Sequence, residues 1–259
     1  MEIKVAKFGG TSLADAVQIA KVKKIIEADP ARRYIVPSAP GKSAFYNVKV
    51  TDLLYALEHA IEKKEDYHSF YRQICERFTD IKRDLGLQID IESKLEEILH
   101  NLLAGAGEDY AASRGEYLNG MLIADYLGYT FIDAAEVILF DKRGKYDEKR
   151  TEKALFERLR TVERAVIPGF YGSMPNGTIK TFSRGGSDVT GAIVSAAVHA
   201  DLYENWTDVS GFYMADPRIV KHAKRVESIT YRELRELSYM GAAVLHEDSI
   251  FPVYKYAIP

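Results

Sequence analysis

Short apolar runs that end in glycine or proline alternate with longer amphipathic stretches along the chain. Residues 3–8 form an apolar run closed by Gly9-Gly10, and a stretch with one apolar helical face follows, with Thr11-Ser12 as its expected N-cap. Residues 33–38 form a second apolar run, ended by Ala39-Pro40-Gly41. The order strand, glycine-rich turn, helix, strand predicts a parallel sheet whose crossover connections are helices.

A long helical segment interrupts this alternation. Residues 52–127 carry many charges, leucines and isoleucines and no proline, with expected breaks near Gly86 and at Gly105-Ala106-Gly107. We interpret the segment as a helical layer or insertion.

Strand-like runs resume in the second half of the chain. They cover residues 129–133, 165–167, 178–182 and 202–207, with a hairpin turn expected at 173–177. Residues 189–200 are rich in alanine, valine and isoleucine and predict a buried helix, and residues 231–240 predict another helix. The fold class predicted from the pattern is α/β with some antiparallel pairing.

Composition narrows the class of protein. The 259 residues are 47% hydrophobic and 28% charged, with a net charge of −3, which argues against disorder and against a nucleic-acid or anionic-membrane surface. One cysteine, Cys75, excludes an internal disulfide and a cysteine-based zinc site. No apolar run reaches the ~18 residues of a membrane span. The N-terminus lacks the pattern of a signal peptide, so we expect a cytoplasmic setting.

The first glycine-rich loop, Lys7-Phe8-Gly9-Gly10-Thr11-Ser12, is a candidate phosphate site. Glycines after a strand let backbone N–H groups approach a phosphate, and the Lys7 cation can neutralise a transferring phosphoryl group. A plain strand-to-helix turn with a surface lysine stays open as the alternative. The loop lacks the spacing of a Walker A motif.

The second glycine-rich loop spans residues 183–188. Arg184 can grip a carboxylate through two hydrogen bonds, Ser187 offers a hydroxyl, and Asp188 can accept from an ammonium or hold a metal-bound water. The alternative is a glycine-rich helix start that Ser187 or Asp188 caps.

Other candidates are weaker when taken singly. Glu116 can meet a ligand amine or be a solvated helix residue, and Tyr213 can stack on a base or belong to the core. Asp216-Pro217-Arg218 offers either a phosphate-facing arginine or a turn with a surface ion pair.

Taken in order, the motifs of the whole chain resemble the aspartokinase family. The motifs that carry the resemblance are Lys7-Phe8-Gly9-Gly10-Thr11-Ser12, Ser38-Ala39 with Thr51-Asp52, Gly115-Glu116, Gly169-Phe170, Arg184-Gly185-Gly186-Ser187-Asp188, Trp206-Thr207-Asp208, Asp216-Pro217-Arg218, and Gly241-Ala242 with Val244-Leu245-His246.

The resemblance implies the amino-acid-kinase fold, a three-layer αβα sandwich with a mainly parallel central sheet of about eight strands. It implies one catalytic domain over residues 1–259. Residues 1–165 would form the amino-acid side, with the helical insertion at about 52–127, and residues 166–259 the nucleotide side.

The resemblance also implies an activity, the ATP-dependent phosphorylation of the L-aspartate side chain to 4-phospho-L-aspartate, the first step of lysine, threonine and methionine biosynthesis. Lys7 and Asp188 would be catalytic. The expected ATP-binding residues are Lys7, Phe8, Gly9, Gly10, Ser12, Thr207, Asp208, Tyr213, Asp216, Arg218 and Val244. The expected aspartate-binding residues are Ser38, Thr51, Glu116, Arg184, Ser187 and Asp188.

The implied ligands are ATP, with Mg²⁺ carried by the nucleotide rather than by protein ligands, and L-aspartate. No nucleic acid or membrane partner is expected. A homodimer is an open alternative, because the sequence does not determine the oligomeric state.

The chain departs from the family pattern at several positions. Ala243 stands where a family lysine is expected near the nucleotide, Glu247 where a proline is expected, and Ser183 where a glycine is usual. Members of the family continue past the position of Ile258-Pro259 into regulatory ACT domains, whereas the sequence ends there. We therefore expect no ACT domain in this chain and no feedback inhibition by lysine or threonine. Other acceptors (glutamate, N-acetylglutamate, carbamate or UMP) and a non-catalytic amino-acid-binding subunit are the alternative functions.

Overall fold

A computed structural model describes residues 2–183, 185–208, 211, 213, 220, 222–239 and 250–259. In this part of the chain five strands form one sheet in the order β3-β4-β2-β1-β7, and every neighbouring pair is parallel. The strands are β1 (Lys4–Phe8), β2 (Arg32–Pro37), β3 (Thr130–Phe131), β4 (Ala165–Val166) and β7 (Leu202–Trp206).

Helices connect these strands and cover the sheet. They are α1 (Ala16–Glu27), α2 (Val50–Glu62), α3 (His68–Leu85), α4 (Ile91–Leu103), α5 (Glu108–Leu127), α6 (Ala134–Val137), α7 (Glu148–Leu159), α8 (Gly186–Ala197), α9 (Tyr231–Tyr239) and α10 (Ile250–Lys255). None of the helices described here is long and apolar enough to cross a membrane.

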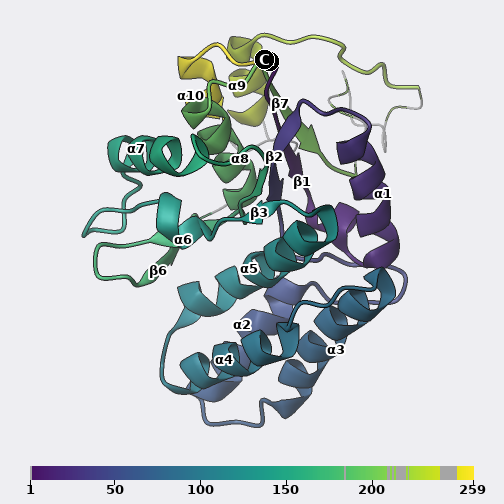
Figure 1. Ribbon diagram of the computed structural model, residues 1–259, viewed down its shortest axis with the longest axis vertical. Coiled ribbons are helices and arrows are strands. Elements are labelled where there is room, and N and C mark those ends of the chain that lie inside the picture. Colours follow the sequence, from purple (N-terminus) through teal and green to yellow (C-terminus); the bar gives the residue numbers. More distant parts are fainter. Residues whose placement is uncertain are drawn as a thin grey trace.

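Alternation along β1 separates two hydrophobic cores. Ala6 and Phe8 point into a core shared with α1 to α5, whereas Val5 belongs to a second core shared with α7, α8 and α10. The sheet therefore lies between two helical layers, and α1 and α8 lie on its opposite sides (Figure 1). Lys7 follows the same alternation and lies on the α8 side.

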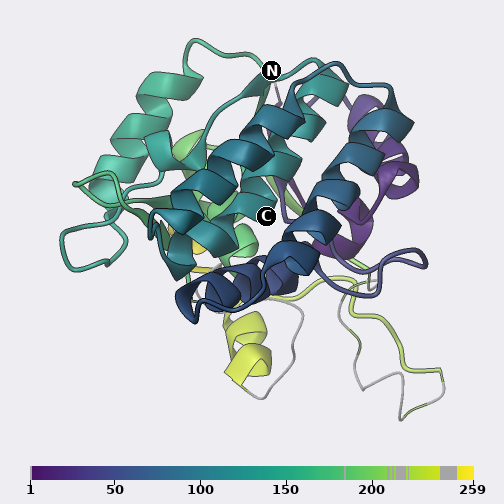
Figure 2. The ribbon, with the colours of Figure 1, turned by 90° about the horizontal axis from the view of Figure 1, so that it is seen from below.

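The helical segment predicted at 52–127 is confirmed as the helices α2 to α5. Gly86 ends α3 in the left-handed conformation (φ 68°), and Gly105 and Gly107 (φ 87° and 84°) separate α4 from α5. Seen from below, the four helices form a continuous layer over one end of the molecule (Figure 2). Helix α5 is buried on most sides because it packs against this layer and against β2, β3 and β4.

The predicted α/β fold with a mainly parallel sheet is confirmed, with differences in detail. The main sheet has five described strands rather than about eight, and β5 (Tyr171–Ser173) and β6 (Ile179–Thr181) form a separate antiparallel hairpin. The sequence patterns did not predict α6 and α7. The division into two lobes at residue 165 stays a prediction.

The predicted N-cap of the first helix is wrong. Residues Gly10–Leu13 form a 3₁₀ turn, and α1 begins later, where Asp15 accepts a hydrogen bond of 3.0 Å from the Gln18 amide. Both positions carry side chains able to cap a helix, and the tight turn after the glycine pair moves the helix start to the second one.

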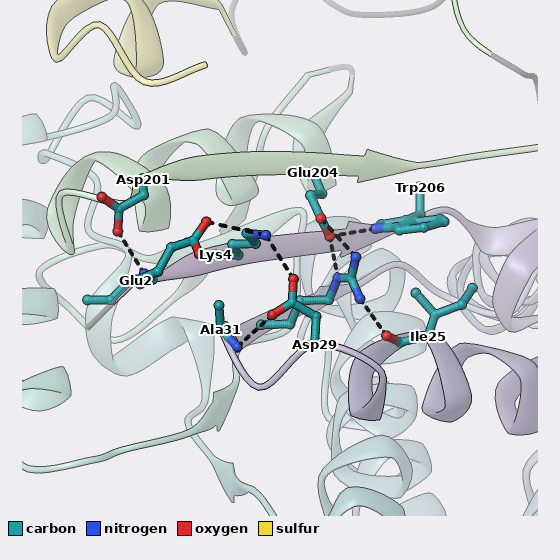
Figure 3. Close-up of polar contacts among 10 residues, drawn as sticks. Glu2, Lys4, Ile25, Asp29, Ala31, Asp201, Glu204 and Trp206 are labelled. Atoms are coloured by element: carbon teal, nitrogen blue, oxygen red, sulfur yellow. Dashed lines mark hydrogen bonds and ion pairs between the residues drawn. The ribbon is translucent and has the colours of Figure 1, made fainter.

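An ion-pair cluster joins β7, the last strand in the order of the described sheet, to β2 and α1 (Figure 3). Arg32 donates to both oxygens of Glu204 (2.7 and 3.0 Å) and to the Ile25 carbonyl, and the Trp206 indole donates to the same carboxylate at 2.9 Å. A two-point arginine–carboxylate pair restricts orientation as well as distance. The carboxyl end of β7 is thereby held beside β1.

Candidate active site

Lys7 and Asp188, which lie 181 positions apart in the sequence, form an ion pair. The Lys7 ammonium lies 2.6 Å from Asp188 Oδ1, and the two side chains are only 9% and 17% exposed. Lys7 is the penultimate residue of β1, and Asp188 lies in the first turn of α8. Because little water screens the pair, its attraction is stronger than that of a surface ion pair.

A cavity of about 230 Å³ opens beside this pair. It lies beyond the carboxyl ends of β1, β2 and β4, where open α/β sheets bind ligands. Six residues predicted as site residues line it together: Lys7, Ser38, Thr51, Glu116, Ser187 and Asp188. Phe170, Gly185 and Gly186 complete the lining.

Glu116 places a buried carboxyl group in the wall of the cavity. Burial raises the pKa of Glu116 to about 8, although the Ala39 amide and the Arg114 cation both favour the ionised form. Its Oε2 atom has no hydrogen-bond partner among the described residues. Burial excludes the water that would stabilise the ionised carboxylate, and a bound cation would stabilise it instead. Glu116 therefore suits a cationic ligand.

The N-terminus of α8 also faces the cavity. Gly185 precedes the helix in the left-handed conformation (φ 58°), and no side chain caps the first turn. The N–H groups of the first helical turn have no intrahelical partners, so they and the helix dipole favour an anion there. Phe170, also left-handed (φ 81°), lies across from this turn, and backbone strain of this kind is common at binding sites.

The two loops on the other side of the cavity are in direct backbone contact. The Gly41 amide donates to the Gly10 carbonyl at 2.8 Å, and a Cβ on Gly41 would lie 2.6 Å from the Gly10 backbone. Only glycine allows this approach. The phosphate-loop candidate and the segment that carries Ser38 are therefore held together as one unit.

A buried arginine of α3 supports this unit from below. Arg77 is 1% exposed and donates to the carbonyls of Ala14 (2.8 Å), Gly41 (2.9 Å) and Val48 (2.9 Å), with the Tyr46 ring 3.7 Å from its guanidinium carbon. Burial lowers the pKa of Arg77 to about 10, so the side chain stays cationic at neutral pH.

Several predicted nucleotide residues lie outside this cavity. Phe8 stacks on Trp206 in the core shared with α1 to α5, with 5.9 Å between the ring centroids. Only the backbone of Phe8 is therefore available to a ligand. Thr207 and Asp208 are exposed, and Thr207 lies next to Gly9, whose amide donates to the Trp206 carbonyl at 2.9 Å. Ser12 lies in the 3₁₀ turn, and Tyr213 forms a bridge with Arg225.

Other predicted positions cannot be compared with the structure. Arg184, Asp216, Arg218 and Val244 lie outside the described residues, as do Ala243 and Glu247. Within the described residues no cluster of three or more His, Cys, Asp or Glu side chains is arranged to hold a metal ion.

Sequence reasoning missed three polar residues around the site. Asn119 donates to the Ser38 carbonyl at 2.7 Å, Asn205 donates to Asp188 at 3.0 Å, and Arg77 supports the two loops. Only Asn119 had a usable signal, because it lies three residues after Glu116 on the same helical face.

The parallel sheet, the glycine-rich turns at its carboxyl edge and the largely buried Lys7–Asp188 pair form a ligand site of the kind found at the strand ends of α/β sheets. The chain belongs to the amino acid kinase family, whose sequence profile matches residues 2–259.

Its relatives include aspartokinase 3 of Bacillus subtilis, which is 37% identical over 99% of this chain and 60% of that protein. The structure of Clostridium acetobutylicum aspartate kinase is similar with a TM-score of 0.93 at 54% identity, covering 100% of this chain and 58% of that one. Escherichia coli aspartokinase III in complex with aspartate and ADP gives a TM-score of 0.84 at 30% identity, covering 98% and 60%. The chain thus spans about three fifths of the length of these relatives.

Proposed function

We propose that this chain is the catalytic part of an aspartate kinase, which transfers the γ-phosphoryl group of ATP to the side-chain carboxylate of L-aspartate. The observation that carries the proposal is one cavity that combines the Lys7–Asp188 pair with the buried carboxyl of Glu116, whose Oε2 atom has no hydrogen-bond partner among the described residues. The aspartokinase relatives, one of them in complex with aspartate and ADP, support the same activity.

The chemistry follows from charge, because a carboxylate and a triphosphate must meet against their mutual repulsion. Lys7 and the first-turn N–H groups of α8 would lower this repulsion, so catalysis would consist mainly of positioning and charge neutralisation. The attacking carboxylate is already ionised at pH 7, so the reaction needs no general base.

The amino-acid substrate would bind by its charges. Glu116 would receive the ammonium group of aspartate, and Ser38, Thr51 and Ser187 offer hydrogen bonds to its polar atoms. Arg184 stays a predicted partner of a substrate carboxylate.

The nucleotide side fits an anion. The α8 N-terminus presents backbone N–H groups near Lys7, and N–H groups beside a cation are donors that suit phosphates. Bound Mg²⁺, carried by ATP, would supply further neutralisation of phosphate charge. A homodimer and a cytoplasmic setting remain predictions.

An acceptor panel tests the proposal. The purified chain is incubated with Mg-ATP and L-aspartate, L-glutamate, N-acetylglutamate, carbamate or UMP, with hydroxylamine to trap an acyl phosphate. We expect ATP consumption and a trapped hydroxamate with L-aspartate at a rate well above that with L-glutamate. Preference for any other acceptor would refute the aspartate assignment.

The alternative of a non-catalytic amino-acid-binding subunit has its own signature. Calorimetry would then show binding of aspartate and Mg-ADP, while no acceptor stimulates ATP consumption.

A further inference from the structure

Asn205 lies beside the catalytic pair without a role in the proposed function. It occupies β7 directly opposite Lys7 of β1 in the parallel register, and neighbouring residues of paired strands project from the same face of a sheet. The amide group of Asn205 and the ammonium group of Lys7 therefore reach the first turn of α8 from adjacent strands.

Both groups donate to the same carboxylate oxygen. Asp188 Oδ1 lies 2.6 Å from Lys7 Nζ and 3.0 Å from Asn205 Nδ2. The reverse orientation of the amide would place its oxygen against the carboxylate, so donation is the orientation that electrostatics allows. Two donors from different strands on one oxygen restrict the rotation of the carboxylate.

Strand β7 also holds the backbone of Asp188. Tyr203, two positions before Asn205, donates from its hydroxyl to the Asp188 carbonyl at 3.0 Å. Gly191 of α8 allows this close approach, because a Cβ there would lie 2.5 Å from the Tyr203 hydroxyl oxygen. Strand β7 thus contacts residue 188 at both its backbone and its carboxylate.

We infer that Asn205 is a positioning residue, whose amide holds the Asp188 carboxylate in the orientation that keeps the Lys7 ammonium at the cavity. The inference deepens the proposed function and rests on it for the catalytic consequence. The effect of Asn205 on the Lys7–Asp188 ion pair, however, can be measured without turnover, through the reactivity of the Lys7 amine.

Two variants test the inference. Asn205→Leu has a similar size and no donor, and Asn205→Asp keeps the shape but places a second carboxylate against Asp188. We expect kcat to fall roughly 10- to 100-fold in both, the range expected for a lost hydrogen bond to a charged group, while the KM for aspartate changes much less. We expect Asn205→Asp to be the slower of the two, because like charges repel.

The matched control is Glu204→Gln on the same strand. Glu204 faces the other side of the sheet, where it pairs with Arg32 (Figure 3), so the change perturbs β7 without touching Asp188. We expect lower thermal stability with an unchanged kcat. A fall in kcat in this control as large as in the Asn205 variants would assign the effect to strand packing and overturn the inference.

Trace acetylation with acetic anhydride, quantified by mass spectrometry, reports on Lys7 independently of activity. We expect labelling of Lys7 to rise several-fold in Asn205→Leu relative to the exposed Lys153, because a loosened ion pair shields the amine less. Unchanged labelling would overturn the inference whatever the kinetics show. Increased labelling of Lys7 with an unchanged kcat would refute the claim that the positioning by Asn205 matters for catalysis.

Different results would refute the proposed function and the positioning role of Asn205. An unmodified chain that phosphorylates no acceptor would refute the proposed function, while the labelling would still decide whether Asn205 holds the pair together.

Discussion

Replacing Glu116 by glutamine separates the charge of this carboxyl group from its shape. Burial raises its pKa from 4.5 to about 8, and at about 1.36 kcal/mol per unit this corresponds to about 5 kcal/mol against ionisation in the folded chain without ligand. Glutamine removes the ionisation and keeps the size of the side chain.

The sign of the stability effect follows from proton binding. Between about pH 4.5 and pH 8 the folded state binds more protons at Glu116 than the unfolded state does, so the free energy of unfolding falls as pH rises. Relative to Glu116→Gln, the unmodified chain should lose stability across this window and lose no more above it. The largest difference that the pKa allows is about 5 kcal/mol.

The same group predicts the pH dependence of substrate binding. With a pKa of about 8, about one tenth of the free carboxyl groups are ionised at pH 7. The affinity for aspartate should therefore rise towards pH 8 and level off above it. The Glu116→Gln variant should bind aspartate roughly 10- to 100-fold more weakly without this pH dependence, with little change in the KM for ATP.

The assays are urea unfolding of both proteins at several values between pH 5.5 and 9, and initial rates over the same range. A stability difference that does not change with pH would refute the claim that burial raises this pKa. An unchanged KM for aspartate would remove Glu116 from the substrate site.

Three further predictions concern neighbouring groups. Lys7→Ala should lower kcat by roughly 100- to 1,000-fold with a smaller change in the KM for aspartate, and an unchanged kcat would contradict its role. Trp206 is the only tryptophan, and its carbonyl accepts a hydrogen bond from the Gly9 amide. Titration with Mg-ADP should therefore change the tryptophan fluorescence in a saturable way, and a Trp206→Phe variant should show no such change. Arg77→Met should lower the free energy of unfolding in urea by about 3 kcal/mol, because the carbonyls of Ala14, Gly41 and Val48 lose their donor. Arg72→Met on the exposed face of the same helix should change it by less than about 0.5 kcal/mol.

Some contacts were predictable because their sequence signal is local. The apolar run before Gly9-Gly10 and the glycine-rich start of α8 each identify a strand end or a helix start, and carboxyl ends of parallel strands gather at one edge of a sheet. The placement of Lys7 and Asp188 at one cavity follows from that rule together with the resemblance in motif order.

Other contacts left no signal along the chain. Arg77 lies in a helix whose pattern predicts only an amphipathic surface, and its carbonyl partners are 29 to 63 positions away. Asn205 is one polar residue of strand β7, and its significance depends on the register of β7 against β1 and on the approach of α8.

The sequence by itself determined the alternation of strands and helices, the glycine-rich turns and the helical segment at about 52–127, because these depend on side chains within a few positions of one another. The tertiary structure decided which strands pair, which oxygen of Asp188 is held, and that Glu116 is buried with a pKa raised to about 8. Electrostatic energies of this kind depend on distance and on excluded water, and both are set only when remote segments pack together.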